Sequence, residues 1–118
     1  MDKEIRIIRE PISRDKLRAI AKERFGNLVK AVVGVEQRII ALGGELYSDA
    51  EVVLAEQEGS QREHTWGINL YVEKDGEEFI EFDSVINLKP SFGNRSRGVG
   101  DPEIRTKIIG IVSALVKK

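Results

Sequence analysis

Apolar and polar residues alternate in short blocks along this chain, and the blocks predict both strands and helices. The first block alternates around Ile5 and Ile7, which predicts a strand within residues 4–9. The next block, residues 28–35, is β-branched and mostly apolar on both faces, as is typical of a central strand. After a polar break, residues 39–42 predict a further strand, antiparallel to the central one.

Three other segments carry helix signals. Each begins with a side chain that can accept hydrogen bonds from the first backbone N–H groups, and the first two end at a glycine suited to a left-handed C-cap. The predicted starts are Ser13, Ser48 and Asp101, and the predicted stops are Gly26 and Gly59. The second start also has capping-box spacing, because Glu51 follows Ser48 by three residues.

A hairpin is predicted at Asp75-Gly76, between a strand over residues 65–73 and a second apolar stretch over residues 78–88. The second stretch is either one long strand or two strands joined by a bend near Asp83. Opposed residues share a sheet face, so an odd loop of residues 74–76 with a left-handed glycine brings the two apolar sets together. The apolar face then carries Trp66, Ile68, Leu70 and Val72 with Ile80, Phe82, Ile86 and Leu88, and the opposite face carries Asn69, Tyr71, Glu81, Asp83 and Asn87.

These elements run in the order β-α-β-β-α-β-β-α. Consecutive strand pairs separated by helices favour an α+β fold with a mostly antiparallel sheet. We expect about three helices packed on one face of that sheet. The length of 118 residues is that of one domain, so residues 1–118 are predicted to form a single unit.

Composition narrows the possible functions. Nineteen Lys and Arg residues against twenty Asp and Glu give a net charge of −1, which disfavours a general nucleic-acid binder and a polybasic membrane anchor. The absence of cysteine excludes disulfides, thiolate nucleophiles and Cys-ligated zinc. With one histidine, three-histidine zinc catalysis is excluded as well. No apolar segment has the length of a signal sequence or a membrane span, so a cytoplasmic location is expected.

Several segments together resemble a family of short prokaryotic proteins classed as a domain of unknown function. The similar segments are Gly43-Gly44-Glu45-Leu46, Asp49-Ala50-Glu51, Gly59-Ser60, Trp66-Gly67-Ile68-Asn69-Leu70-Tyr71, Ile80-Glu81-Phe82-Asp83-Ser84, Ile86-Asn87 and Gly93-Asn94-Arg95-Ser96-Arg97. The resemblance spans roughly residues 30–116 and implies a self-contained domain without an assigned activity. This chain has Tyr47 where the family pattern has histidine, which weakens any metal site built on a Glu-x-His pattern.

Acidic residues near the second helix are the first candidate site. Glu45, Asp49 and Glu51 carry oxygen ligands that suit a hard cation, which makes Glu45 and Asp49 the candidate metal ligands. Alternatively, Asp49 and Glu51 stabilise the start of the helix through the capping box and the helix dipole. The second reading explains their spacing fully and leaves only Glu45 unexplained.

The expected bend after residue 82 is the second candidate. Asp83 and Ser84 lie there beside Asn69 and Asn87, and a carboxylate next to a hydroxyl and two amides can position a substrate. The alternative is a bulge whose freed backbone groups are satisfied by these side chains.

The glycine-rich loop over residues 91–100 is the third candidate. Arg95, Arg97 and Asn94, with backbone N–H groups, can hold a phosphate or carboxylate. Asp101 competes with an anion for the N–H groups of the last helix, so the two arginines must provide the charge. The alternative is a self-bonded loop that pairs its arginines with nearby acids. His64 is expected in an exposed loop and Trp66 in the core.

Two functional hypotheses remain open. The first is a small non-catalytic binding or assembly domain, expected to be a homodimer, which uses the polar sheet face and the loop of Arg95 and Arg97 to bind an anionic small molecule. The second is a small enzyme acting on an anionic or phosphorylated molecule, with Asp83 or Glu45 as the acid–base group and the two arginines as the clamp. RNA or DNA contact through the same arginines is a third, weaker hypothesis, and the pattern identifies no cofactor.

Overall fold

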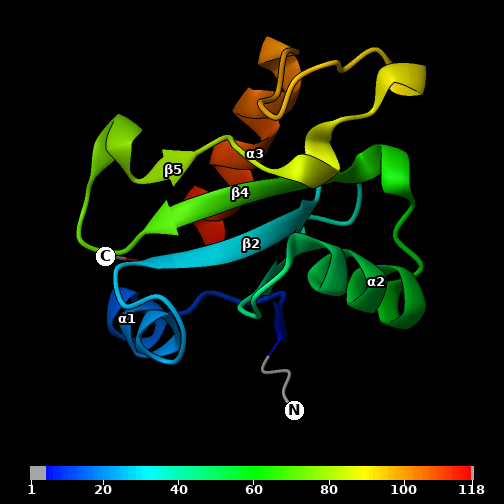
Figure 1. The fold of residues 1–118 in the computed structure, drawn as a ribbon. Coiled ribbons are helices and arrows are strands. Elements are labelled where there is room, and N and C mark those ends of the chain that lie inside the picture. The colour runs from blue at the N-terminus through cyan, green and yellow to red at the C-terminus, as the bar shows by residue number, and fades with distance from the viewer. Residues whose placement is uncertain (1–4, 118) are drawn as a thin grey trace.

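Five antiparallel strands form one sheet, in the spatial order β1-β3-β2-β4-β5 (Figure 1). This computed structural model describes residues 5–117. The strands are β1 (Arg6–Ile8), β2 (Leu28–Gly34), β3 (Ile39–Leu42), β4 (Thr65–Tyr71) and β5 (Ile80–Glu81), and the helices are α1 (Arg14–Lys22), α2 (Tyr47–Glu58) and α3 (Pro102–Leu115). The α+β class and the predicted order of strands and helices are therefore confirmed. No helix within residues 5–117 is long and apolar enough to cross a membrane.

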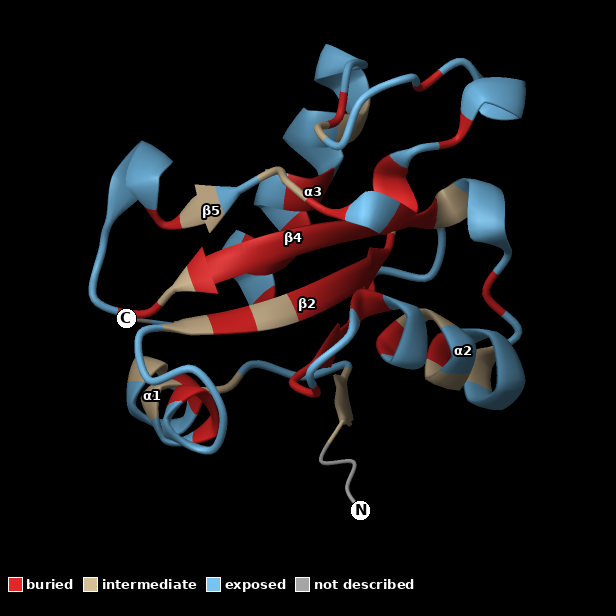
Figure 2. Ribbon diagram, viewed as in Figure 1, coloured by how far each residue is buried: buried red, intermediate tan, exposed pale blue. Residues whose placement is uncertain are grey.

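The helices cover both faces of the sheet, so the expectation that all three pack on one face is wrong. The main core joins α1 and α3 to the face that carries Ala31, Ile40 and Ile68, whereas α2 packs on the opposite face against Val32 and Ala41. Both faces of β2 and β3 are consequently buried (Figure 2). A strand that is apolar on both faces needs a cover on each of them, which is the physical reason for the two-sided arrangement.

The predicted helix starts are confirmed for α1 and α3. The Ser13 side chain accepts from the backbone of Lys16, and the Asp101 carboxylate accepts from the backbone of Glu103. Gly59 is the left-handed C-cap of α2, as predicted, with φ of 71°. The predicted C-cap of α1 at Gly26 is wrong, because the helix ends at Lys22 with Glu23 as a right-handed cap, and the left-handed Gly26 lies beyond it.

The capping box predicted for α2 is wrong. The helix starts at Tyr47, and its N-cap residue Leu46 makes no side-chain cap. Ser48 therefore lies inside the first turn. Glu51 accepts a hydrogen bond from the Thr65 hydroxyl at 2.9 Å instead of closing the helix end.

The β4–β5 pairing has the predicted register, although the connection is longer than predicted. Leu70 opposes Ile80 and Asn69 opposes Glu81, as an odd loop requires. The chain leaves β4 after Tyr71 and returns through a short 3₁₀ turn that begins at Gly76. Residues 78–88 form neither one long strand nor two strands joined by a bend near Asp83, the two forms predicted, because regular pairing stops at Glu81 and a further 3₁₀ turn covers Val85–Asn87.

Beyond Glu81, side chains instead of strand backbone pair with β4. The Asn87 side chain accepts from the Gly67 N–H at 2.8 Å and donates to the Gly67 carbonyl at 3.0 Å, as a strand backbone would. A Cβ atom at position 67 would overlap the buried Ser84 side chain, so only glycine permits this approach. The turn also places Ile86 on the α2 face and leaves Leu88 exposed, contrary to the predicted apolar face.

Candidate functional site

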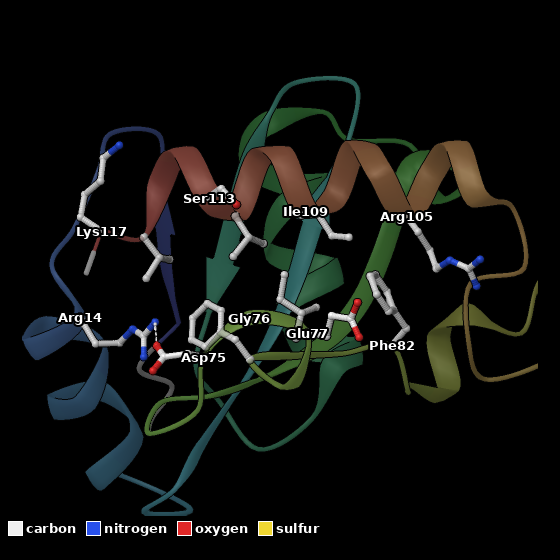
Figure 3. Close-up of a pocket in the computed structure, with 13 residues that line it drawn as sticks. Arg14, Asp75, Gly76, Glu77, Phe82, Arg105, Ile109, Ser113 and Lys117 are labelled. Atoms are coloured by element: carbon white, nitrogen blue, oxygen red, sulfur yellow. Dashed lines mark hydrogen bonds and ion pairs between the residues drawn. The ribbon is translucent and has the colours of Figure 1, made fainter.

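A groove runs between α3 and the β4–β5 hairpin (Figure 3). Its volume is about 670 Å³, within the range of roughly 300–1,000 Å³ that is usual for ligand pockets. Its lining is mostly apolar and comes from Phe79, Ile80 and Phe82 on the hairpin and Ile109, Val112 and Val116 on α3. Sequence analysis did not identify it, because its two walls lie more than twenty residues apart in the chain.

Each wall of the groove follows from a simple periodicity. Ile80 and Phe82 are two residues apart in extended chain, so their side chains share the sheet face that α3 covers. On α3, residues 108, 111 and 115 face the core, while Ile109 and Ser113 share the adjacent side, four residues apart. Figure 3 shows Ile109 and Ser113 on the side of the helix toward the hairpin. Ile109 keeps 46% of its surface exposed, so α3 presents one exposed apolar side chain to the groove.

Arg14 closes one end of the groove. Its guanidinium stacks on the Phe79 ring, 4.2 Å from the centroid, and donates to the carbonyls of Val72 at 3.0 Å and Lys74 at 3.2 Å. Asp75 adds a contact at 3.4 Å. The Nε atom is buried and has no hydrogen-bond partner among residues 5–117. Arg14 therefore fixes the hairpin against α1 and brings a donor to the groove.

Arg105 lies at the opposite end of the groove (Figure 3). One of its N–H groups donates to the Val99 carbonyl at 3.0 Å, and the side chain is otherwise exposed. The lining thus combines three cationic side chains with the carboxylates of Asp75 and Glu77. An apolar centre with charged groups at its ends suits a ligand that has an apolar body and polar flanks.

The predicted polar sheet face forms one hydrogen-bonded cluster. Asn69 donates to the Glu81 carboxylate at 2.9 Å and accepts from the Tyr47 hydroxyl, and Tyr71 donates to Glu81 at 3.0 Å. Burial raises the pKa of Tyr47 above its ordinary value, and the hydrogen bond to Glu81 raises the pKa of Tyr71. Asn69 also contacts the backbone of Asp83 at 3.3 Å. These groups satisfy one another.

Ser84, Asn87 and Asn94 are used within the protein. Ser84 is fully buried and accepts from the backbone of Ile86, and Asn87 binds Gly67 and the carbonyl of Arg97. The Asn94 side chain reaches carbonyls at positions 87, 96 and 98 and accepts from the N–H at position 100. The loop is therefore self-bonded around Asn94, the alternative that sequence analysis left open.

The two loop arginines differ. Arg97 forms an ion pair with Asp83 at 2.7 Å, so the clamp and the acid–base residue of the enzyme hypothesis do come together. Arg95 is exposed and makes no hydrogen bond or ion pair with any residue between 5 and 117. An anion bound at this loop could contact Arg95 directly, whereas Arg97 is already paired with the carboxylate of Asp83.

The acidic candidates near α2 do not gather into one cluster. No three Asp, Glu or His side chains converge anywhere within the described part of the chain. The side chains of Glu45 and Asp49 are exposed, and Lys30 contacts Glu45 only through its backbone carbonyl, at 2.7 Å. Glu51 is engaged by Arg62 at 3.3 Å.

Lys89 is a second feature that the sequence did not reveal. Its side chain is fully buried, and its Nζ atom has no hydrogen-bond partner among residues 5–117. The nearest carboxylate oxygen belongs to Glu51, 3.9 Å away, and the Trp66 ring centroid lies at 5.1 Å. Burial lowers the pKa of Lys89 to about 8. The only signal was its position between Leu88 and Pro90, which does not distinguish a buried lysine from an exposed one.

The two single aromatic candidates lie where the sequence indicated. Trp66 is a core residue with 3% of its surface exposed. His64 is partly exposed in a short turn before β4, 3.5 Å from Glu63 and 3.8 Å from Glu36.

Comparison with known proteins gives a family match. Residues 6–115 match the model of a family described as "Protein of unknown function (DUF5674)", a longer span than the resemblance seen in the sequence. No curated protein and no solved structure matches the chain.

Proposed function

We propose that this chain, which belongs to that family of proteins of unknown function, is a non-catalytic binding domain whose site is the groove between α3 and β5. The supporting observation is the groove itself, which has a volume of about 670 Å³ and a mostly apolar lining. No other part of residues 5–117 fills it. Ile109 lies exposed at its rim. Contiguous exposed apolar surface between charged rims is typical of a binding site.

A polarity-sensitive dye tests the groove. Anilinonaphthalene sulfonate is expected to bind the purified protein with increased fluorescence, because its apolar rings suit the groove and its sulfonate suits Arg105. Ile109→Gln should weaken dye binding at least threefold, since it places an amide in the apolar lining of the groove.

The matched control is Val52→Gln. Val52 is an exposed apolar residue on α2, with 49% of its surface exposed, on the other side of the sheet. Dye binding should be unchanged in this variant. Equal losses in the two variants, or none in Ile109→Gln, would reject the groove as the site.

We also propose a homodimer, with the polar sheet face at the interface. Support comes from the exposed apolar residues Leu46 and Val85, which are next in sequence to Tyr47 and Ile86 on that face. Native mass spectrometry tests the proposal, and a monomer at micromolar concentration would contradict it. A cytoplasmic location remains the expectation from the sequence.

The enzyme hypothesis keeps one favourable observation, the contact between Arg97 and Asp83. In that proposal Arg95 and Arg97 bind the anionic part of the substrate, and Asp83 transfers the proton. Substrate would first have to displace Arg97 from Asp83, because the ion pair holds the carboxylate at 2.7 Å. The binding domain is the better-supported function because its groove needs no such rearrangement.

A further inference from the structure

The outer edge of β5 is open. The N–H of Tyr71 donates to the carbonyl of Phe79 at 2.9 Å, and Asn69 opposes Glu81 in the ladder. Hydrogen-bonded and non-bonded pairs alternate in an antiparallel ladder, so the N–H and C=O groups of Ile80 point away from β4. No strand lies beyond β5 in the sheet that residues 5–117 form. These backbone groups can therefore pair with another extended chain.

The two sides of this edge differ in chemistry. The α3 side is the apolar groove. The other side is a hollow of about 470 Å³, where Glu77, Glu78 and Glu81 outnumber the one cation, Lys74. Glu77 and Glu78 are exposed, and Lys74 lies over the Tyr71 ring, 5.3 Å from its centroid. One strand edge thus separates an apolar surface from an acidic one.

We propose that the occupant of the groove is an extended peptide segment of a partner protein, with apolar and basic residues in alternation, which adds to the sheet beside β5. Alternate side chains of a strand point to opposite faces. Apolar side chains would enter the groove between β5 and α3, and basic side chains would meet the acidic hollow. Backbone pairing with Ile80 sets the register, as in other complexes formed by strand addition.

Charge argues against a second copy of this chain as the occupant. Two β5 edges paired about a two-fold axis would bring Glu77, Glu78 and Glu81 of each copy near the same residues of the other. Like charges opposed across paired strands are destabilising. The acidic hollow is complementary to a basic partner. This inference rests on the proposed function, because it names the ligand of the same groove.

The test uses the full chain and three synthetic seven-residue peptides. The first alternates valine and lysine, the second alternates valine and glutamate, and the third contains the residues of the first in two blocks. Calorimetry should show that the alternating lysine peptide binds at least tenfold more tightly than the other two. The alternating lysine peptide should also displace the dye and shift the backbone amide resonance of Ile80. Two further peptides carry N-methyl groups on every second backbone nitrogen, one at odd and one at even positions. One of the two should fail to bind, because its methyl groups block the N–H groups that pair with β5.

Protein variants separate the two sides of the edge. Glu78→Gln should weaken the lysine peptide about threefold at low salt, and the difference should disappear at high salt, because Glu78 lines the acidic hollow but not the groove. Glu56→Gln is the matched control on α2, because Glu56 is also an exposed acid on the other side of the molecule, and it should change nothing. Ile109→Gln should weaken the same peptide without altering its dependence on salt.

The outcomes are distinguishable. If the dye requires Ile109 but no peptide displaces it, the peptide inference is overturned and the binding groove stands. A dimer that dissociates in Ile109→Gln would assign the groove to a second copy and would also overturn the inference. If neither dye nor peptide responds to Ile109→Gln, both proposals fail.

Discussion

The backbone N–H and C=O groups along the two edges of β4 find their hydrogen-bond partners in different ways. On the β2 side, seven residue pairs run from Leu28 with Tyr71 to Gly34 with Thr65. On the other side, β5 supplies two residue pairs, and the side chain of Asn87 supplies the next partner. The β2 side of β4 is thus covered by strand backbone along its whole length. The other side, the substituted edge, is covered by backbone over two residues and by a side chain beyond them, and the groove lies between β5 and α3 on that side.

The largest expected effect comes from breaking the substituted edge. Asn87→Ala should lower the free energy of unfolding by about 3 kcal/mol, because it leaves the N–H and C=O of Gly67 buried without partners. Urea denaturation measures the change.

Asn27→Ala is the control, since Asn27 is exposed and only its backbone carbonyl makes a hydrogen bond, to Val72. Its effect should stay within about 0.5 kcal/mol. A similarly small loss for Asn87→Ala would show that the side chain does not replace a strand.

A smaller effect is expected at Lys89, in the segment that covers the same edge. The pKa of its amine falls from 10.5 to about 8 on folding, so the unfolded chain binds more protons between these two values. The contribution of Lys89 to stability should therefore be constant below pH 8 and rise by about 3 kcal/mol as the pH increases toward 10.5. Lys89→Met should be more stable than the parent at pH 7, and its stability should lack this rise.

Thermal unfolding from pH 7 to 10.5 gives the measurement. Lys107→Met removes an exposed lysine from α3 and should leave the pH dependence of the parent protein intact. If Lys89→Met retains the full rise, or is less stable than the parent at pH 7, the amine has a compensating partner in solution.

The smallest effect concerns the loop that follows the substituted edge. Replacing Arg95 and Arg97 together by alanine should change stability by less than about 1 kcal/mol, because both side chains are largely exposed and the only ion pair lost is that with Asp83. The thermal shift induced by inorganic phosphate should disappear if the loop binds anions. An unchanged phosphate response would remove both the anion-binding role of the loop and the clamp of the enzyme hypothesis.

The comparison of the two edges also explains which sequence predictions succeeded. Residues 39–42 form β3 as predicted, and the pairing of Leu70 with Ile80 follows from the apolar alternation on both sides of Asp75-Gly76. These are local patterns with a fixed period. The prediction of one strand or two bent strands over residues 78–88 failed because the apolar residues Phe82 and Ile86 are buried on different faces of the sheet, before and after the turn at Ser84.

The candidate site was predictable only in part. Sequence analysis grouped Asn69, Tyr71, Glu81 and Asp83 correctly, because they share the parity of one hairpin. It identified Asn87 and Asn94 as ligand candidates, and the structure shows their amides bound to the backbone. A side chain that satisfies the backbone and one that awaits a ligand have the same residue type, so sequence alone does not separate them.

The sequence by itself determined the elements that depend on neighbouring residues. These are the N-caps of α1 and α3, the glycine stop of α2, the order of strands and helices, and the hairpin register, because each follows from hydrogen bonds or periodicities within a few residues. The tertiary structure alone decided which face each helix covers, that Lys89 is buried, and that α3 and β5 enclose a groove. Those features depend on contacts between residues far apart in the chain, where a local pattern carries no information about which surfaces meet.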